Sequence, residues 1–126
     1  MNIKPDSDSQ KITGKVIDLK RATEFLNKTD ISYAKKMLNM LVDTFPNELK
    51  ILESSYQQNN WDEIISVAHR LRGCTIYAGA YRLHLASANL ENALTSKNSG
   101  NPENAEKLYQ SLISEIAKVK QAYQKL

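Results

Sequence analysis

Residues 60–80 read NWDEIISVAHRLRGCTIYAGA, and this pattern predicts one amphipathic helix with a defined start and end. Asn60 and Glu63 resemble a capping box, in which the Asn side chain accepts a hydrogen bond from the first turn and the Glu reaches back to the backbone. We expect the helix to begin at about Trp61 and to end at Tyr77 or Ala78, because the next residue is a glycine that can adopt the left-handed conformation. At about 100° per residue, one side of this helix must face a core, and that side comprises Ile64, Val67, Ala68, Leu71, Cys74, Thr75 and Ala78.

Four more helices are predicted along the chain from apolar residues that recur at steps of three and four. Asp18 can cap a short first helix, and Asp30 can cap a long second one. Pro46 interrupts the long helix without changing the phase of its apolar stripe, so we expect one helix with a kink near this proline. The expected ranges of the four helices are about 18–27, 30–56, 80–95 and 102–126.

The length of 126 residues fits a single domain, at roughly 150 residues per domain. Only four Gly and three Pro leave too few turn-forming residues for a meander or sandwich of short strands. We therefore expect an all-α fold, an antiparallel four-helix bundle with an additional short N-terminal helix. Residues 1–16 show no apolar period and are expected to be a mobile leader or linker, while residues 17–126 form the bundle domain.

Charge and hydropathy exclude several classes of protein. Seventeen basic and fourteen acidic residues give a formal net charge of +3, too small to imply a nucleic-acid footprint. No stretch approaches the roughly 18 consecutive apolar residues of a membrane span, and the N-terminus lacks the apolar core of a signal peptide. The single cysteine cannot form an internal disulfide, so we expect a cytoplasmic environment.

His69 is expected on the solvent side of the helix over residues 61–78, with small residues about one turn away on either side. Ser66 precedes it, and Gly73 follows it on the same face, where a missing side chain lets another surface approach the imidazole. A glycine inside a helix costs about 1 kcal/mol relative to alanine, so its presence here needs an explanation. Arg72 can direct a permanent cation toward an anionic group on the ring. An exposed nucleophilic ring, a cleared approach and a nearby cation are what a phosphoryl acceptor needs.

The run Ala68-His69-Arg70-Leu71-Arg72-Gly73-Cys74, followed by Gly79-Ala80, resembles the signature of histidine-phosphotransfer (HPt) domains, His-x-Leu-Lys/Arg-Gly-Ser/Ala with a later Gly-Ala. The similarity covers about residues 18–126 in helix order and spacing, and the run 73–79 resembles the terminal HPt domains of BarA/GacS-type hybrid sensor kinases. The resemblance implies that His69 is phosphorylated through Nε2, that Arg72 steadies the phosphoryl oxygens, and that Gly73 is the close-approach glycine. Arg72 departs from the more frequent Lys, and Cys74 from the usual Ser or Ala.

The resemblance also implies a phosphoryl carrier in a multistep phosphorelay of a two-component system, and not an enzyme. A response-regulator receiver domain would bring an aspartyl phosphate and its own Mg²⁺, His69 would attack, and the group would later pass to another receiver aspartate. The sequence has no Gly-rich phosphate loop and no kinase residue set, so we expect no ATP binding, no cofactor of its own and no metal site. Whether the receivers belong to the same hybrid sensor kinase stays open; in that case the chain would lie on the cytoplasmic side of the membrane. We expect a monomer that contacts neither nucleic acid nor the membrane directly.

Partner-binding residues are expected around the histidine, because a receiver must cover the ring and exclude water. Ile65 and Ile76 flank His69 on the helical wheel and are the first candidates, with Ser66 and Arg70 beside them and exposed residues of the first two helices next. For the two isoleucines, packing between helices is an equally good interpretation.

Three further residues have an ordinary interpretation as well as a functional one. His84 is expected to lie at the surface or between helices, and Cys74 to be a small core residue with no redox role. Glu91 can hydrogen-bond near the phosphoacceptor, but a solvated carboxylate is favoured. The alternatives to a relay protein are a non-catalytic helical bundle that binds a protein partner and, disfavoured by the modest charge, a helical nucleic-acid adaptor.

Overall fold

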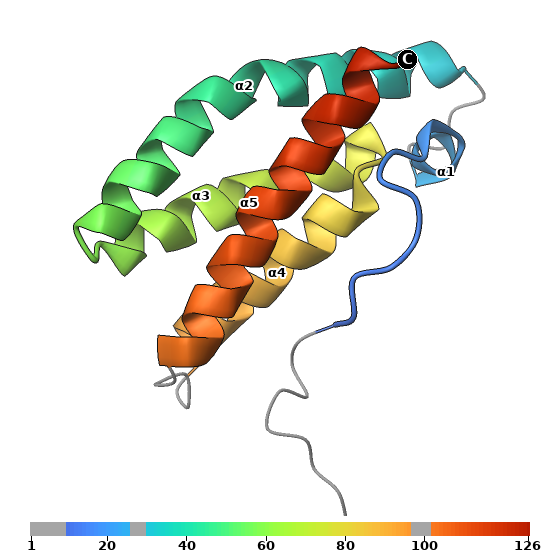
Figure 1. The fold of residues 1–126 in the computed structure, drawn as a ribbon. Helices are drawn as coiled ribbons and strands as arrows, with labels where there is room; N and C mark the ends of the chain where they lie inside the picture. Colours follow the sequence, from blue (N-terminus) through green and yellow to red (C-terminus); the bar gives the residue numbers. More distant parts are fainter. Residues whose placement is uncertain (1–9, 26–29, 97–101) are drawn as a thin grey trace, which may run out of the picture.

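The computed structural model describes residues 10–25, 30–96 and 102–126, and Figure 1 shows their arrangement. The four long helices form an antiparallel bundle, and a short one packs near one end against the second helix and the turn after the third. No strand occurs among the described residues, so the predicted all-α fold is confirmed. The elements are α1 (Leu19–Phe25), α2 (Ile31–Gln57), α3 (Trp61–Thr75), the 3-10 turn η1 (Ile76–Ala78), α4 (Tyr81–Thr95) and α5 (Pro102–Gln124).

The starts of α1 and α2 follow the sequence expectations, and α2 is one continuous helix through Pro46, as expected. The Asp18 carboxylate accepts a hydrogen bond from the Arg21 amide at 3.1 Å, and the Asp30 carboxylate accepts one from the Ser32 amide at 2.9 Å. α2 continues through Pro46, and Figure 1 shows its axis bending along its length. The predicted turn over residues 97–100 lies outside the described residues, as do residues 1–9 and 26–29.

The start of α3 differs from a full capping box. The Asn60 side chain accepts a hydrogen bond from the Glu63 amide at 3.2 Å, as expected. The prediction that the Glu63 side chain accepts from the Asn60 amide is wrong, because this amide donates to the Ser55 carbonyl at 2.8 Å. The backbone at the end of α2 therefore supplies the acceptor that the sequence assigned to a glutamate.

A tight joint connects α3 to α4. The α-helix ends at Thr75, η1 follows, and Gly79 adopts a left-handed conformation with φ of 76°. The Ala80 amide then donates to the Thr75 carbonyl at 3.0 Å, and α4 begins one residue later. The Gly79 carbonyl accepts from the Asp18 amide at 2.8 Å, which fixes the start of α1 to the same joint.

The core forms where the apolar stripes of the long helices meet. Each fully buried Leu, Ile or Phe side chain contributes about 1.5–3 kcal/mol to folding relative to an exposed one. The largest fully buried apolar side chains are Leu38, Phe45 and Leu52 of α2, Ile64, Val67 and Leu71 of α3, Leu83 and Leu90 of α4, and Leu112, Ile116 and Val119 of α5.

Residues 10–18, which we call the N-terminal segment, lie against the bundle, so the mobile leader predicted over residues 1–16 is wrong for residues 10–16. Gln10 exchanges two hydrogen bonds of 2.8 Å with the side chain of Asn89, one through its amide and one through its carbonyl. Ile12 and Val16 pack against the core, and the Gly14 carbonyl accepts from Arg82 at 3.4 Å. These apolar side chains and paired backbone groups make the segment part of the domain.

A charged cluster joins α4 to α5. The Arg82 guanidinium makes two parallel hydrogen bonds to the Glu115 carboxylate, at 3.0 and 2.9 Å, and Lys118 adds a contact at 3.3 Å. Burial alone would raise the pKa of Glu115, but the hydrogen bonds from Arg82 and Lys118 outweigh it and hold the pKa below its usual value. The carboxylate is therefore ionised in the folded protein over the whole neutral range.

The joint predicts opposite effects for two glycine substitutions. An added Cβ at Gly79 would lie 2.5 Å from the Asp18 carbonyl oxygen in a left-handed backbone, so Gly79→Ala should lower the free energy of unfolding by about 3 kcal/mol. A Cβ at Gly73 meets no atom within 4 Å, so Gly73→Ala should raise the free energy by up to about 1 kcal/mol. Urea unfolding followed by circular dichroism measures both, and equal stabilities would contradict the described joint.

The charged cluster predicts a pH-dependent loss of stability. At pH 7, Glu115→Gln should lower the free energy of unfolding by about 2 kcal/mol, because the half-buried Arg82 loses its carboxylate. Because the pKa of Glu115 is lower in the folded protein than its ordinary value of 4.5, its ionised carboxylate stabilises the fold at pH values above 4.5. This stabilisation is lost as the pH falls through the pKa of the folded state. The difference in the free energy of unfolding between variant and wild type should therefore be constant from about pH 6 to 7, where the carboxylate is fully ionised. It should shrink below about pH 4.5.

The control for this prediction is the exposed Glu53 on α2, whose substitution Glu53→Gln should change stability by less than about 0.5 kcal/mol. A gap between Glu115→Gln and wild type that persists unchanged in acid would show that the carboxylate charge is not the cause.

Candidate functional site

His69 stands at the middle of α3 with its side chain 73% exposed. Its helix neighbours Ala68 and Leu71 are buried, so the apolar side of α3 holds the helix while the imidazole projects into solvent. The exposed mid-helix position predicted from the sequence agrees with the structure.

The imidazole is not free to rotate, because α4 holds one of its nitrogens. His69 Nδ1 lies 2.6 Å from a carboxylate oxygen of Glu91. A carboxylate can only accept, so Nδ1 carries the proton, and the lone pair of the neutral ring is on Nε2. The arrangement fixes the tautomer in which Nε2 can act as a nucleophile toward solvent or a partner.

Glu91 also contacts Arg72, so one carboxylate holds both residues. Arg72 Nη1 donates to the second oxygen of Glu91 at 3.1 Å and lies 3.5 Å from the Asn92 side-chain oxygen. Burial would raise the pKa of Glu91, whose side chain is 14% exposed, but hydrogen bonds from Arg72 and His69 outweigh this effect and lower the pKa. The expectation that Glu91 is a solvated carboxylate is therefore wrong, because this carboxylate joins Arg72 to His69.

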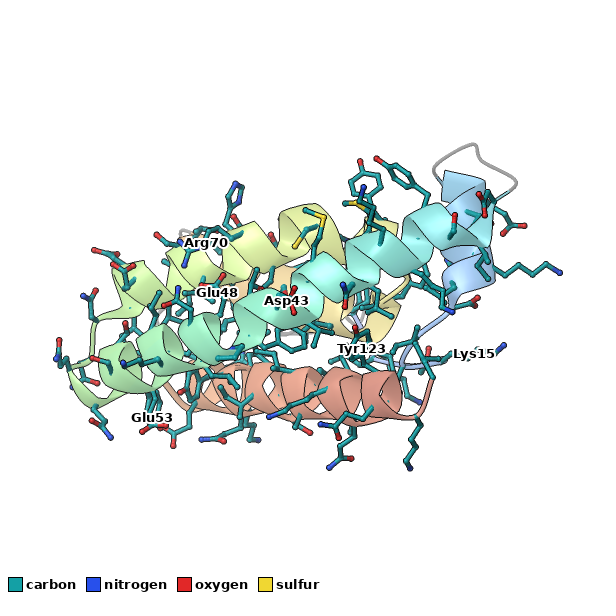
Figure 2. The ribbon with its side chains drawn as sticks, turned by 90° about the horizontal axis from the view of Figure 1, so that it is seen from above. Lys15, Asp43, Glu48, Glu53, Arg70 and Tyr123 are labelled. Carbon is teal, nitrogen blue, oxygen red and sulfur yellow. The ribbon has the colours of Figure 1, made fainter. Side chains whose placement is uncertain are left out.

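Arg70 has an intramolecular partner that the sequence did not indicate. Its guanidinium donates to both oxygens of Glu48 on α2, at 3.2 and 2.8 Å, and Figure 2 shows the two side chains pointing toward each other. This hydrogen bonding raises the pKa of Arg70 above its ordinary value. Arg70 is still 47% exposed, so a docked partner can contact it, but its charge is already balanced by a buried carboxylate.

The approach to the ring along α3 is open. Gly73 is exposed, and the space where its side chain would stand contains no atom within 4 Å. Ser66 on the other side is also exposed, and its hydroxyl donates to the Asp62 carbonyl at 3.2 Å. Internal packing therefore does not require a glycine at position 73.

Exposed apolar side chains also occur on α2 and η1, outside α3. Ile65 and Ile76 are each half-buried. Met40 of α2 is 56% exposed and Tyr77 of η1 is 41% exposed. These exposed apolar side chains add to the candidates for partner contact that the sequence indicated on α3 and on the first two helices.

Two further residues lie where the sequence placed them. Cys74 is half-buried, its thiol donates to the Arg70 carbonyl at 3.4 Å, and burial raises the pKa of that thiol, so the small core role is supported. His84 lies between helices, with Nδ1 3.1 Å from both the Arg72 carbonyl and the Thr75 hydroxyl. Among the residues that the structure describes, no group of three or more His, Cys, Asp and Glu is placed to hold a metal ion. None of the described helices is long and apolar enough to span a bilayer.

The contact between His69 and Glu91 predicts the ring tautomer. In wild type, ¹H–¹⁵N NMR should show a protonated Nδ1 and an unprotonated Nε2 for neutral His69, and Glu91→Ala should shift the ring toward protonation on Nε2. His84, the second of two histidines in the chain, donates Nδ1–H to a backbone carbonyl and serves as the internal control with an unchanged pattern. An unaltered His69 pattern in Glu91→Ala would show that the carboxylate does not set the tautomer.

Comparison with known proteins gives one family. A family model described as Hpt domain matches residues 36–122. No curated protein and no solved structure was found that matches the chain. The matched range contains α3, α4 and every residue of the site described above.

Proposed function

The chain belongs to the Hpt domain family, whose members are phosphocarrier modules with a phosphotransfer role in phosphorelays, and on this premise we propose that His69 is the residue that carries the phosphoryl group. The observation that supports this proposal most directly is the exposed ring whose Nδ1 is held by Glu91, so that Nε2 is left with a lone pair at the surface. In this proposal the group comes from an aspartate of one receiver domain and passes to an aspartate of another.

The chemical step needs little from the protein beyond position and charge. Nε2 of His69 attacks phosphorus in line with the aspartyl oxygen; the Nε2–P bond forms as the P–O bond breaks, and the electron pair returns to the receiver carboxylate. The ring keeps its proton on Nδ1 and gains positive charge, which the Glu91 carboxylate at 2.6 Å stabilises. The reverse sequence delivers the group to the second receiver.

Arg72 contributes a cation whose position is set before the partner arrives. Its Nη1 is used by Glu91, while the remaining guanidinium donors can face the phosphoryl oxygens on Nε2. Because the guanidinium is already ordered, less side-chain entropy is lost when the anion appears. We propose that the Mg²⁺ of the reaction is bound by the receiver domain and that ATP takes no direct part.

The docking surface that we propose is centred on His69 and extends toward α2. An interface of about 800 Å² per partner has a radius of about 16 Å. Tyr33, Met37 and Met40 follow one another at spacings of four and three on α2, on the flank that also carries Glu48, the partner of Arg70. Met40 is about 12 Å along the helix from Glu48, so at least Met40 falls within an interface of this size.

Labelling tests the proposed phosphoacceptor. When the protein is mixed with a receiver domain carrying labelled aspartyl phosphate, acid-labile and alkali-stable label should appear on it and be absent from His69→Gln. Arg72→Ala should slow transfer about tenfold with an unchanged circular dichroism spectrum, because an oriented cation is lost from the charged transition state. Label that persists in His69→Gln would identify another acceptor, and an absence of label in wild type with every receiver tried would favour a non-catalytic interaction module.

Two surface variants test the proposed docking surface. Met40→Glu and Gly73→Ala should slow transfer from a receiver domain by about tenfold, the first by placing a charge in an apolar contact and the second by filling the approach to the ring. Phosphoramidate, a small donor that needs no docking surface, should be affected far less by either substitution. Equal slowing with both donors would contradict a role in docking, and Gly73→Ala cannot act by unfolding because it is expected to stabilise the helix.

A further inference from the structure

His84 contacts α3 at the turn that carries Arg72, a contact that the proposed phosphotransfer role does not explain. Its Nδ1 lies 3.1 Å from the Arg72 carbonyl oxygen. A carbonyl oxygen can only accept, so Nδ1 carries the proton and donates. The Thr75 hydroxyl, also 3.1 Å from Nδ1, can share this proton as a second acceptor. The hydrogen bond therefore joins the first turn of α4 to the last turn of α3.

The place of this contact in the fold gives it a specific use. α3 changes from α-helical to 3-10 geometry immediately after Thr75, so regular α-helical hydrogen bonding does not continue beyond its last turn. Arg72 lies in that turn, and the direction of its side chain depends on the backbone there. A donor anchored in α4 at this point restrains the backbone from which Arg72 extends.

α4 thus holds Arg72 at both ends. His84 donates to its carbonyl, and Glu91, seven residues later on the same face of α4, accepts from its guanidinium at 3.1 Å. His84 is half-buried in the groove between the two helices, and burial lowers the pKa of its imidazole, so the neutral, donating form is present at pH 7. A side chain that served only to fill space here would not need a donor at this nitrogen.

We infer that His84 is a positioning residue for phosphoryl transfer, which fixes the helical turn of Arg72 through its Nδ1–H hydrogen bond to the Arg72 carbonyl. This inference rests on the proposed function, because the position of Arg72 matters only if a phosphoryl group is bound on His69. His84 itself touches neither the reacting ring nor the phosphoryl group in this account.

Substitutions of different donor capacity test the inference. Asn places its side-chain N–H₂ close to the position of Nδ1, so the rate of His69 phosphorylation in His84→Asn should be within about twofold of that in wild type. His84→Leu lacks a donor, and its rate should be about tenfold lower. The donor is phosphoramidate, whose P–N bond breaks with release of ammonia as the Nε2–P bond forms, so receiver docking does not enter the measurement. Leu85→Ala, at a half-buried position in the same turn of α4, is the control for general loosening and should leave the rate within about twofold.

A double-substitution cycle separates positioning from a purely structural role. In an Arg72→Ala background, His84→Leu should slow phosphorylation by less than about twofold, because the side chain that it positions is gone. Arg72 also gives a readout without phosphorylation. Its Nε–H signal in ¹H–¹⁵N NMR should have the distinct chemical shift of a fixed side chain in wild type and His84→Asn, and the averaged shift of a mobile one in His84→Leu. Equal rates for the Asn and Leu variants, an undiminished Leu effect in the Arg72→Ala background, or an unchanged Arg72 signal would each overturn the inference.

The two proposals fail in different ways. If wild type gains no label on His69, the proposed function fails, while the Arg72 signal still decides whether His84 orders that turn. If wild type is labelled and the His84 variants behave alike, the function stands and the inference about His84 falls.

Discussion

The joint between α3 and α4 is the constraint on which the site depends. Only η1, Gly79 and Ala80 separate the two helices, and the left-handed Gly79 turns the chain so that α4 returns directly beside α3. The shortness of the connection fixes the register of the two helices. In that register Glu91 faces His69 and His84 faces Arg72. A longer or looser turn would leave the same residues on the same helices without bringing their side chains together.

The site is preorganised by balanced charges on both sides of the imidazole. On the α4 side, Glu91 is shared between Arg72 and His69, and on the α2 side Glu48 is paired with Arg70. Each carboxylate is mostly buried and each guanidinium is partly exposed. The two cations are therefore accessible at the surface while each is paired with a carboxylate that lies deeper in the bundle. An arrangement of this kind stabilises charge that develops at the surface without having to reorganise when it appears. It also suits a carrier that must accept a group from one partner and release it to another with little change in its own structure.

Local patterns in the sequence predicted most of the fold. The helix starts at Asp18, Asp30 and Asn60 and the glycine at the end of η1 depend on residues within a few positions of one another, and apolar periodicity assigned the core faces. The exposure of His69 followed from the same periodicity. The family match over residues 36–122 agrees with the resemblance seen in the His69 motif.

Contacts between residues far apart in the chain could not be predicted in this way. Glu91 contacts His69 across 22 positions, and a polar residue on a helix flank has the same sequence pattern whether it faces solvent or a neighbouring helix. Gln10 reaches Asn89 across 79 positions, and its surroundings are too polar to show an apolar period, so residues 10–16 resembled a leader. The pairing of Arg70 with Glu48 was missed for the same reason, since only the packing of α2 against α3 brings them together.

The N-terminal segment has a practical consequence for anyone who excises this domain for biochemistry. The range that matches the family begins at residue 36, inside α2, and a fragment cut there would lose the Asp30 cap, α1 and the residues that bond to Asn89 and Gly79. Buried Ala34 would be removed, and apolar groups beneath α1 and Ile12 would be left open to water. The expression boundary for a stable domain therefore lies before Gln10, well upstream of the range that matches the family.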